Sequence, residues 1–335
     1  NGETGVSIFF VLSGFLIPYI IISEIKINGK LDVRKFYMRR ILRIWPLYYA
    51  TLLITLVIYP LFKLGMGMEY SLDTNIWYHL FFLSNFDAMH VYQLVDHQIE
   101  LSQIVSWSVS IEEQFYVFWP LIFLLSRKAW GAIVLIFVIV SLYFRFSHTN
   151  NEFVLYYHTL SVIGDLAMGG LLAYLIHHYK QIRSFFENSS TWTHLILLIG
   201  ILLVLFYENW FTNDDNLRPF YRLVTSFLFA LFIASQALTK KESYLNLSKL
   251  KFASRWGKLT YGIYLLHQVA ILIVHLIITK ALQYRYQDEA LTILFFGVIS
   301  FVVTLVMSNL SYKYLELRFL NLKHRYSVMK SEKPR

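Results

Sequence analysis

Two neighbouring carboxylates stand inside an apolar stretch, and they are the first candidates for acid–base chemistry. Glu112 and Glu113 belong to the run SWSVSIEEQFYVFWP, which covers 106–120. A carboxyl group in a membrane is costly, so a functional role is the default hypothesis, and action as general acid or base is its sharper form. Tyr116 follows Glu112 by four residues and Glu113 by three, so a helix places its hydroxyl within reach of either one. The structural alternative is a polar contact with a neighbouring helix or with an outer loop.

A histidine in a second polar run offers another group for proton transfer. In GKLTYGIYLLHQ, residues 257–268, a helical rotation of about 100° per residue puts Tyr261, Tyr264 and Gln268 on one stripe, with His267 on its flank. His267 is therefore a candidate for proton transfer or substrate contact. The alternative that the sequence leaves open is a hydrogen bond between helices.

Three arginines in a third run could bind phosphates. The segment KFYMRRILRIWPLYY, residues 35–49, places Arg39 and Arg43 four residues apart and Arg40 and Arg43 three apart, so their guanidinium groups share one helix face. Guanidinium groups fork onto phosphate oxygens, and an acyl-CoA donor carries several phosphates. The alternative is that these arginines anchor the chain at lipid headgroups.

Several further polar residues could line a path for substrate. Asp165 falls inside an apolar stretch with no basic neighbour in sequence, so it needs either a partner on another helix or a proton. Ser13 and Gly14 form a small notch that serves helix packing or admits an acyl chain. The absence of cysteine excludes a cysteine nucleophile, disulfides and thiolate ligands, and no metal site is expected. The predicted lining residues are Ser13, Trp107, Ser110, Tyr116, Asp165, Tyr261 and Tyr264.

The elements that position these residues are membrane-spanning helices. The 335 residues are 57% apolar and only 15% charged, whereas soluble proteins have about 25% charged residues. Apolar stretches of about 20 residues are long enough to cross a bilayer. The short apolar segment 74–86 is expected to be re-entrant or interfacial. We expect an all-α transmembrane bundle with nine spans, near 5–25, 45–64, 106–126, 130–146, 154–178, 193–208, 219–239, 259–281 and 290–312.

The basic residues indicate how the spans are oriented. If 26–44 is cytoplasmic and 74–86 does not cross, 24 of the 30 Lys and Arg residues fall on the cytoplasmic side, as the positive-inside rule requires. The net charge of +9 then lies between spans and indicates a lipid bilayer, not nucleic acid, as the partner. This orientation puts the C-terminus in the cytoplasm and Asn1 outside. Because the chain then opens on an inward-running span, we expect that a preceding helix is absent from the numbered sequence.

The polar runs resemble those of acyltransferase family 3, the integral membrane acyltransferases that O-acetylate bacterial surface polysaccharides and related sugars. The resemblance rests on GVSIFFVLSGFLI, KFYMRRILRIWPLYY, WSVSIEEQFYVFWP and GKLTYGIYLLH in that order, with YKYLELRF at 312–319 as a weaker fifth motif. It implies about ten helices, an acyl-CoA site at Arg40 and Arg43, and a catalytic His on the helix expected before Asn1. It also implies a location in the bacterial inner membrane.

We therefore predict a multi-pass O-acyltransferase. It would move an acetyl or other short acyl group from acetyl-CoA to a hydroxyl of a cell-surface polysaccharide or lipid-linked sugar. Residues 1–320 would form the membrane acyltransferase domain, and 321–335 a short basic cytoplasmic tail. The predicted catalytic residues are Glu112, Glu113 and His267, and the predicted donor-binding residues are Arg39, Arg40 and Arg43.

Two other classes of protein share these features. Intramembrane Glu, Asp and His residues also mark proton relays, so a proton-coupled transporter or exporter of a lipid-linked or small substrate is the main alternative. A membrane scaffold without catalysis is the third. Release of free CoA in the presence of an acceptor distinguishes the enzyme, and proton-coupled flux without it distinguishes the transporter. A scaffold would tolerate replacement of the polar intramembrane residues.

Overall fold

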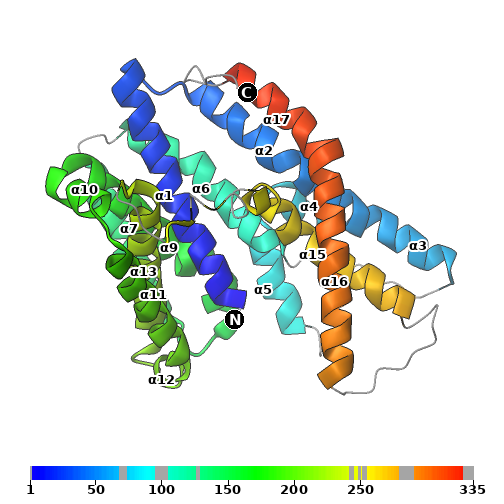
Figure 1. Ribbon diagram of the computed structural model, residues 1–335. Coiled ribbons are helices and arrows are strands. Elements are labelled where there is room, and N and C mark those ends of the chain that lie inside the picture. Colours follow the sequence, from blue (N-terminus) through cyan, green and yellow to red (C-terminus); the bar gives the residue numbers. More distant parts are fainter. Residues whose placement is uncertain are drawn as a thin grey trace. The chain divides into compact units, whose positions relative to one another are not determined.

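The computed structural model describes residues 2–67, 74–94, 105–125, 129–240, 245–247, 250, 255–278 and 290–326. Every regular element in these residues is a helix, which confirms the predicted all-α class for the described part of the chain (Figure 1). The elements are α1 (Gly2–Asn28), α2 (Val33–Leu53), η1 (Ile54–Ile58), α3 (Tyr59–Gly65), α4 (Ile76–Leu80), α5 (Ser84–Leu94), α6 (Ser106–Leu125), α7 (Trp130–Ser147), α8 (Glu152–Tyr157), α9 (Thr159–His178), α10 (Lys180–Glu187), α11 (Thr191–Phe206), α12 (Glu208–Thr212), α13 (Arg218–Leu238), α15 (Thr260–Leu276), α16 (Ala290–Ser311), η4 (Tyr312–Glu316), α17 (Leu317–Lys323) and η5 (His324–Tyr326).

Several of these helices are long and apolar enough to cross a bilayer. Within the described residues they number six, or seven if α10 and α11, which meet at a bend of 96°, form one broken span. α15 is apolar but has 17 residues, and α6 carries Glu112, Glu113 and Gln114 in its middle; neither is among the six. The chain is thus a multi-pass membrane protein, and the total of nine spans remains a prediction. The six are Gly2–Asn28, Val33–Gly65, Trp130–Ser147, Glu152–His178, Arg218–Leu238 and Thr292–Lys323.

The chain divides into two compact units, each made of segments that are distant in sequence. Unit 1 comprises 1–31, 88–93 and 111–253. Unit 2 comprises 32–87, 94–110 and 254–335. The first turn of α6 belongs to unit 2 and the rest of this helix to unit 1.

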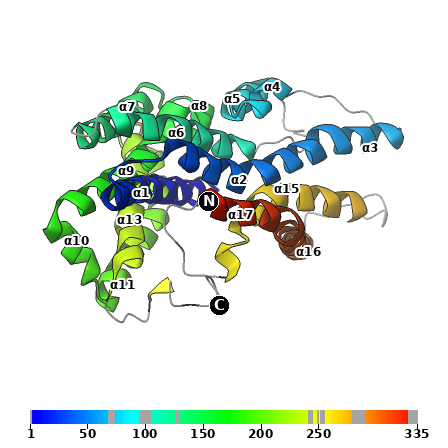
Figure 2. The same cartoon turned by 90° about the horizontal axis from the view of Figure 1, so that it is seen from above.

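Unit 1 is built on α1, α9 and α13, which pack against one another (Figure 2). Glycines let α1 and α9 approach closely, as small residues do in lipid. A Cβ atom on Gly14 would lie 2.1 Å from the carbonyl oxygen of Leu166, and one on Gly169 would lie 2.2 Å from that of Val11. The backbone of α9 therefore fills the notch that Ser13 and Gly14 were predicted to form.

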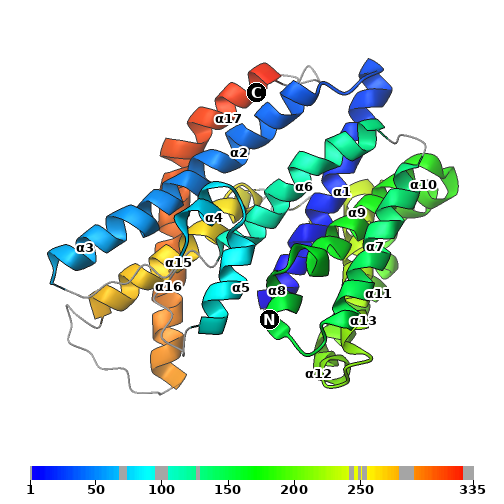
Figure 3. The same ribbon diagram turned by 180° about the vertical axis from the view of Figure 1, so that it is seen from behind.

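Unit 2 is built on α2, which packs against α15 and α17, while α15 packs against α16 (Figure 3). Asp32 caps the start of α2, because its side chain accepts a hydrogen bond from the backbone N–H of Lys35 at 3.0 Å. The same hydrogen bond is the main reason why the pKa of Asp32 lies below its usual value. The cap starts a helical stretch that continues through η1 and α3 to Gly65.

The predicted re-entrant segment 74–86 consists of α4 and the start of α5. The five residues of α4 rise only about 8 Å, which is too short to cross a bilayer. The chain reverses through Phe82, whose φ of 56° is rare for a bulky residue. The Phe82 ring is buried and stacks on Tyr48 of α2, with 4.5 Å between ring centroids. This packing holds the turn in place, and the position of the segment relative to a membrane remains a prediction.

Candidate active site

In unit 1, α6 presents the carboxylate of Glu112 to two hydroxyl groups. Ser13 of α1 and Tyr116 of α6 both donate hydrogen bonds to Oε1 of Glu112, and the two hydroxyl oxygens lie 3.5 Å apart. All three side chains are buried, as is that of Glu113. The contact between Tyr116 and Glu112 is the one that their spacing along a helix predicts. The arrangement fixes the orientation of the Tyr116 hydroxyl, which is a requirement for any catalytic use of it.

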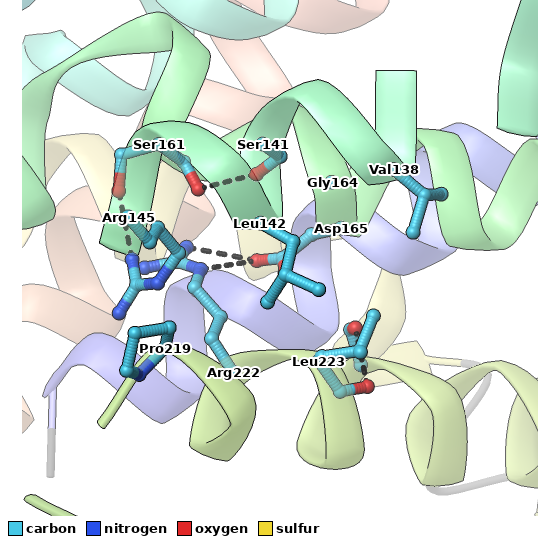
Figure 4. A pocket seen from close by; sticks show the side chains of 11 residues that line it. Val138, Ser141, Leu142, Arg145, Ser161, Gly164, Asp165, Pro219, Arg222 and Leu223 are labelled. Carbon is cyan, nitrogen blue, oxygen red and sulfur yellow. Dashed lines mark hydrogen bonds and ion pairs between the residues drawn. The ribbon is translucent and has the colours of Figure 1, made fainter. Parts of the chain in front are cut away.

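A buried arginine balances the charge of Asp165. In Arg222 of α13, Nη2 lies 2.8 Å and Nε 2.9 Å from Oδ2 of Asp165 on α9. Its Nη1 lies 2.9 Å from Oε1 of Glu3 near the start of α1. Figure 4 shows the guanidinium of Arg222 facing the Asp165 carboxylate. This is the partner on another helix that the sequence required for Asp165, and the two ion pairs tie α1, α9 and α13 together.

A second arginine lies beside this pair at the end of α7. Nη1 of Arg145 donates to Oγ of Ser161 at 2.7 Å (Figure 4). The same nitrogen donates to the carbonyl of Leu155 at 3.2 Å. Its Nε has no hydrogen-bond partner among the described residues. The cavity that Arg145, Ser161, Asp165 and Arg222 line measures about 10 Å³, which is room for a single water molecule. The cavity is too small for a sugar or a thioester, so this region of unit 1 suits a structural role.

A larger, apolar cavity of about 310 Å³ lies between α6, α7 and α9 in unit 1. This volume falls within the usual range for small-molecule sites, roughly 300–1,000 Å³. Most of its lining side chains are aromatic or aliphatic. Two polar residues, Gln114 and Thr159, also line it, and the Thr159 hydroxyl donates to Oε1 of Gln114 at 2.8 Å. Trp119 also lines it and is buried, and its indole N–H has no acceptor among the described residues. The cavity can hold an apolar chain.

In unit 2, the predicted arginine cluster gains a fourth cation. Nη1 of Arg39 donates to the backbone carbonyl of Tyr326 at 3.0 Å, and the Arg40 guanidinium lies 5.6 Å from the ring centroid of Phe36. Lys323 of α17 lies close enough to Arg39, Arg40 and Arg43 for electrostatic repulsion between their charges and its own. Clustered like charges attract a polyanion, so the site is suited to phosphates. The sequence did not predict a role for Lys323, because its proximity to the arginines depends on the packing of α17 against α2, which lies near the other end of the chain.

The tyrosines of α15 contact neighbouring elements of unit 2. The Tyr261 hydroxyl donates to the carbonyl of Ile44 on α2 at 2.9 Å, and the Tyr264 hydroxyl lies 2.5 Å from Oγ of Ser108 on α6. Nδ1 of His267 lies 2.6 Å from the carbonyl oxygen of Tyr264. Because a carbonyl only accepts, Nδ1 carries the hydrogen, and in the neutral ring Nε2 then presents a lone pair. His267 is thus in the tautomer that can accept a proton at Nε2.

A buried Asp–His–Ser arrangement in unit 2 was not predicted from the sequence. Nε2 of His79 lies 3.1 Å from Oδ2 of Asp87, and Nδ1 lies 3.2 Å from Oγ of Ser106. Ser106 in turn donates to Ser84, which lies 2.7 Å from Ser110. The available sequence signal was His79 inside the segment 74–86, which the sequence predicts to be re-entrant or interfacial, and Asp87 directly after this segment.

Comparison with known proteins identifies the family. A family model described as an acyltransferase domain matches residues 1–309. The chain belongs to acyltransferase family 3. This finding confirms the predicted resemblance and the prediction of an acyltransferase.

Curated relatives of this acyltransferase family 3 chain include two bacterial proteins. "O-acetyltransferase OatA" of Staphylococcus aureus (strain NCTC 8325 / PS 47) is 27% identical in an alignment 335 positions long, and this alignment covers 94% of this chain and 52% of OatA. "Putative peptidoglycan O-acetyltransferase YrhL" of Bacillus subtilis (strain 168) is 29% identical in an alignment 339 positions long, and this alignment covers 94% of this chain and 50% of YrhL. The chain thus spans about half the length of these relatives. No solved structure matches it.

The structure groups the predicted site residues of this acyltransferase family 3 chain within each unit. In unit 1 it brings Ser13, Glu112 and Tyr116 into one cluster and places Asp165 in the separate ion-pair network. In unit 2 it gives Arg39, Arg40, Arg43, Tyr261, Tyr264 and His267 positions on α2 and α15, and it places Trp107 and Ser110 in the buried first turn of α6.

Proposed function

We propose that this chain transfers an acetyl group from acetyl-CoA to a hydroxyl of a cell-surface polysaccharide or lipid-linked sugar. Family membership and two curated relatives with O-acetyltransferase names support this reaction class. The name of one relative specifies peptidoglycan, which supports a sugar acceptor. The observation that carries the proposal is the cluster of four cations on α2 and α17, because the CoA part of the donor is rich in phosphate.

The four cations would divide the work of donor binding. The Arg39 guanidinium is partly engaged by the carbonyl of Tyr326, so it anchors η5 against α2. Arg40 is held beside the Phe36 ring, and Arg43 is exposed. Planar guanidinium forks can each bind two phosphate oxygens, whereas the ammonium of Lys323 contributes a point charge. Arg40 and Arg43 would thus position the phosphates, and Lys323 would add attraction.

The transfer needs a group that moves one proton. The acceptor oxygen loses its hydrogen and bonds to the carbonyl carbon of the thioester, the C–S bond breaks, and the CoA sulfur takes up a proton, so no net proton is released. In unit 2, Nε2 of His267 has a lone pair that can accept a proton, so His267 is one candidate for this group. In unit 1, Glu112 would orient the Tyr116 hydroxyl toward the acceptor, and Glu113 would act as a second acid or base.

The apolar cavity of unit 1 favours a lipid-linked sugar over a free polysaccharide as the acceptor. Part of a hydrocarbon chain would fill the roughly 310 Å³ between α6, α7 and α9. Such a cavity in a membrane protein is not stably filled by water, because its lining offers few polar partners. We further propose that the protein lies in the bacterial cell membrane, with nine spans and a cytoplasmic C-terminus.

The absence of cysteine makes the reaction straightforward to test. Because residues 1–335 contribute no thiol, a thiol reagent added to this chain in nanodiscs reports CoA alone. With acetyl-CoA and a polyprenyl-linked disaccharide, we expect free CoA to accumulate and mass spectrometry to find one acetyl group on the sugar. A soluble disaccharide without the lipid should react more slowly. The proposal is wrong if acetyl-CoA and both acceptors remain unchanged.

The buried charge network of unit 1 favours one competing function, a proton-coupled transporter. Glu3, Arg222 and Asp165 form a continuous chain of charges within three candidate spans, as proton pathways do. Proteoliposomes with an internal pH dye distinguish the two functions. An enzyme should release CoA without acidifying the lumen, whereas a transporter should acidify it without releasing CoA.

A further inference from the structure

We propose that Asp87, His79, Ser106, Ser84 and Ser110 form a proton relay that takes up the proton of the acceptor hydroxyl during acyl transfer. The inference deepens the proposed function and rests on it. Its starting point is a chain of contacts inside unit 2, which joins one carboxylate, one imidazole and three hydroxyl groups without a gap.

The geometry of the chain is continuous. The carboxylate of Asp87 lies 3.1 Å from Nε2 of His79, and Nδ1 of the same ring lies 3.2 Å from Oγ of Ser106. The Ser106 hydroxyl donates to Oγ of Ser84 at 2.9 Å, and Ser84 and Ser110 lie 2.7 Å apart. All these distances are within hydrogen-bond range, so a proton can pass from each group to the next.

The five side chains are sealed from solvent. None is more than 5% exposed. A proton on His79 therefore reaches other groups along the chain and not through water. The groups that face His79 are Asp87 from α5, Ser106 from α6 and the hydroxyl of Tyr48 from α2, which donates to the His79 carbonyl at 2.8 Å.

Both oxygens of Asp87 are committed to holding this arrangement. Oδ2 faces the imidazole, and Oδ1 accepts the backbone N–H of Asn75 at 3.1 Å. The carboxylate therefore fixes the ring of His79 in one orientation, as a carboxylate beside a catalytic histidine does. Asp87 is a positioning residue, and His79 is the group that stores the proton.

The hydrogen bonds allow two complete arrangements that differ by one proton. With a proton stored, both ring nitrogens of His79 donate, Ser106 donates to Ser84, and Ser84 donates to Ser110. Without it, Ser110 donates to Ser84, Ser84 to Ser106, and Ser106 to Nδ1, while Nε2–H still faces Asp87. Ser106 and Ser84 each donate one hydrogen bond in both states, because hydroxyl hydrogens rotate freely. The direction from Ser106 to Ser84 in the structure is that of the first arrangement.

The relay fits the proton balance of the transfer. The O–H bond of the acceptor breaks as its oxygen attacks the thioester, and the proton enters at Ser110, which lies at the end of the chain farthest from Asp87. The hydroxyls reverse in turn, and an N–H bond forms at Nδ1 of His79. The proton leaves by the same route when the CoA sulfur is protonated, so the stored proton is returned and the balance is closed.

Two substitutions test the relay at different points. Ser84→Ala cuts the chain between Ser106 and Ser110 and leaves the contact between His79 and Asp87 intact, while Ser84→Thr keeps the hydroxyl. His79→Gln removes proton storage. Ser84→Ala and His79→Gln should each slow acetyl transfer by roughly 10²- to 10⁴-fold, the usual contribution of a general base. Ser84→Thr should retain most of the activity.

The pH profile and the solvent isotope effect separate a relay from a structural contact. In the wild type, transfer should rise with pH, because the relay can accept a proton only in the arrangement without a stored one, and it should slow in D₂O. Both effects should vanish in His79→Gln. The matched control is His194→Gln, which alters another fully buried histidine and should keep both effects. If His79→Gln keeps the wild-type pH profile and isotope effect, the relay is wrong.

A spectroscopic measurement tests the relay even if the wild type transfers no acetyl group, a result that would contradict the proposed function itself. Nuclear magnetic resonance of ¹⁵N-labelled histidine reports whether each ring nitrogen carries hydrogen. The relay requires the His79 ring to gain and lose one proton in the accessible pH range, with Ser84→Ala altering the Nδ1 signal. A His79 ring that stays neutral throughout would overturn the relay independently of any assay.

Discussion

Nη2 of Arg222 lies 2.8 Å from Oδ2 of Asp165, and their side chains are 4% and 2% exposed. Each buried charge would be costly without the other, because removing an ion from water costs roughly several kcal/mol. Breaking a buried pair is therefore worse than replacing it by apolar side chains of similar volume. Glu3 does not change this, since it is 28% exposed and can be solvated alone.

The first prediction follows from this difference between breaking a buried ion pair and replacing both of its members. Asp165→Asn should destabilise the protein by about 3–5 kcal/mol, because it leaves the buried guanidinium with Glu3 as its remaining carboxylate contact. The double variant Asp165→Leu with Arg222→Met should lose much less. Thermal unfolding in detergent measures both. A double variant less stable than Asp165→Asn would show that the pair contributes more than charge compensation.

The sequence could predict that Asp165 needs a partner, but not which one. Arg222 is 57 residues away, and its place near the start of a predicted span is typical of a basic residue at the membrane interface. The contact between Glu112 and Tyr116 was predictable because it lies within one helix. The sequence also gave no reason to pair His79 with Ser106, because that contact depends on how α4 and α6 pack. Local geometry was thus accessible from spacing, and long-range contacts were not.

The second prediction concerns the close approach of α1 and α9. Gly14→Ala should destabilise unit 1 by about 3 kcal/mol, because the new Cβ meets backbone atoms of Leu166 that cannot move aside. Gly5→Ala is the matched control on the same helix, where a Cβ meets nothing within 4 Å. Folded yield after detergent extraction and the melting temperature measure the difference. Equal behaviour of the two variants would contradict the packing of these helices.

The third prediction concerns the donor site. Replacing Arg40 and Arg43 together by Gln should weaken acetyl-CoA binding roughly 10- to 100-fold, the value of one or two charge-assisted hydrogen bonds. Lys at both positions should restore it only in part, since an ammonium lacks the planar fork. Calorimetry with the protein in nanodiscs measures the affinity.

Two further variants complete the donor experiment. Arg34→Gln removes an exposed arginine of the first turn of α2 and should bind donor as the wild type does. Lys323→Gln should lower affinity less than the double arginine variant, because it removes one point charge. Unchanged affinity in the double variant would return the arginines to a role as lipid anchors.

The fourth prediction separates the two carboxylates of α6. Glu113→Gln keeps the shape of the side chain and removes its acid–base capacity, so acetyl transfer should fall on the order of 10²-fold while the folded yield is unchanged. Tyr116→Phe removes the hydroxyl that Glu112 orients and should also lower kcat. Tyr143→Phe, on the exposed face of α7, is the control. A loss of folded yield that parallels the loss of activity would indicate structural roles.

The last prediction concerns the path of α10 and α11, which is either one broken span or a re-entrant loop. The ends of α13 decide between them. Nε of Arg218 at its start donates to the carbonyl of Thr212 at 3.0 Å, and the backbone N–H of Lys240, just past its end, donates to the carbonyl of Glu187 at 3.0 Å. The 21 residues of α13 rise about 32 Å, which is enough to cross a bilayer. The end of α10 and the end of α12 therefore lie at opposite ends of this candidate span, so we expect α11 to cross.

Single cysteines in this cysteine-free chain test the crossing. A cysteine at Asp214 should react with an impermeant reagent from outside intact cells, and one at Lys180 should react only after the membrane is opened. Asn150 is the control, because Nη1 of Arg218 donates to the carbonyl of Thr149 at 2.8 Å, and it should therefore share the side of Asp214. The division of basic residues also predicts labelling from outside near Asp96 and none near Lys249, and both positions lie outside the described residues. Labelling of Lys180 and Asp214 from the same side would make the bent pair re-entrant and remove one of the nine predicted spans.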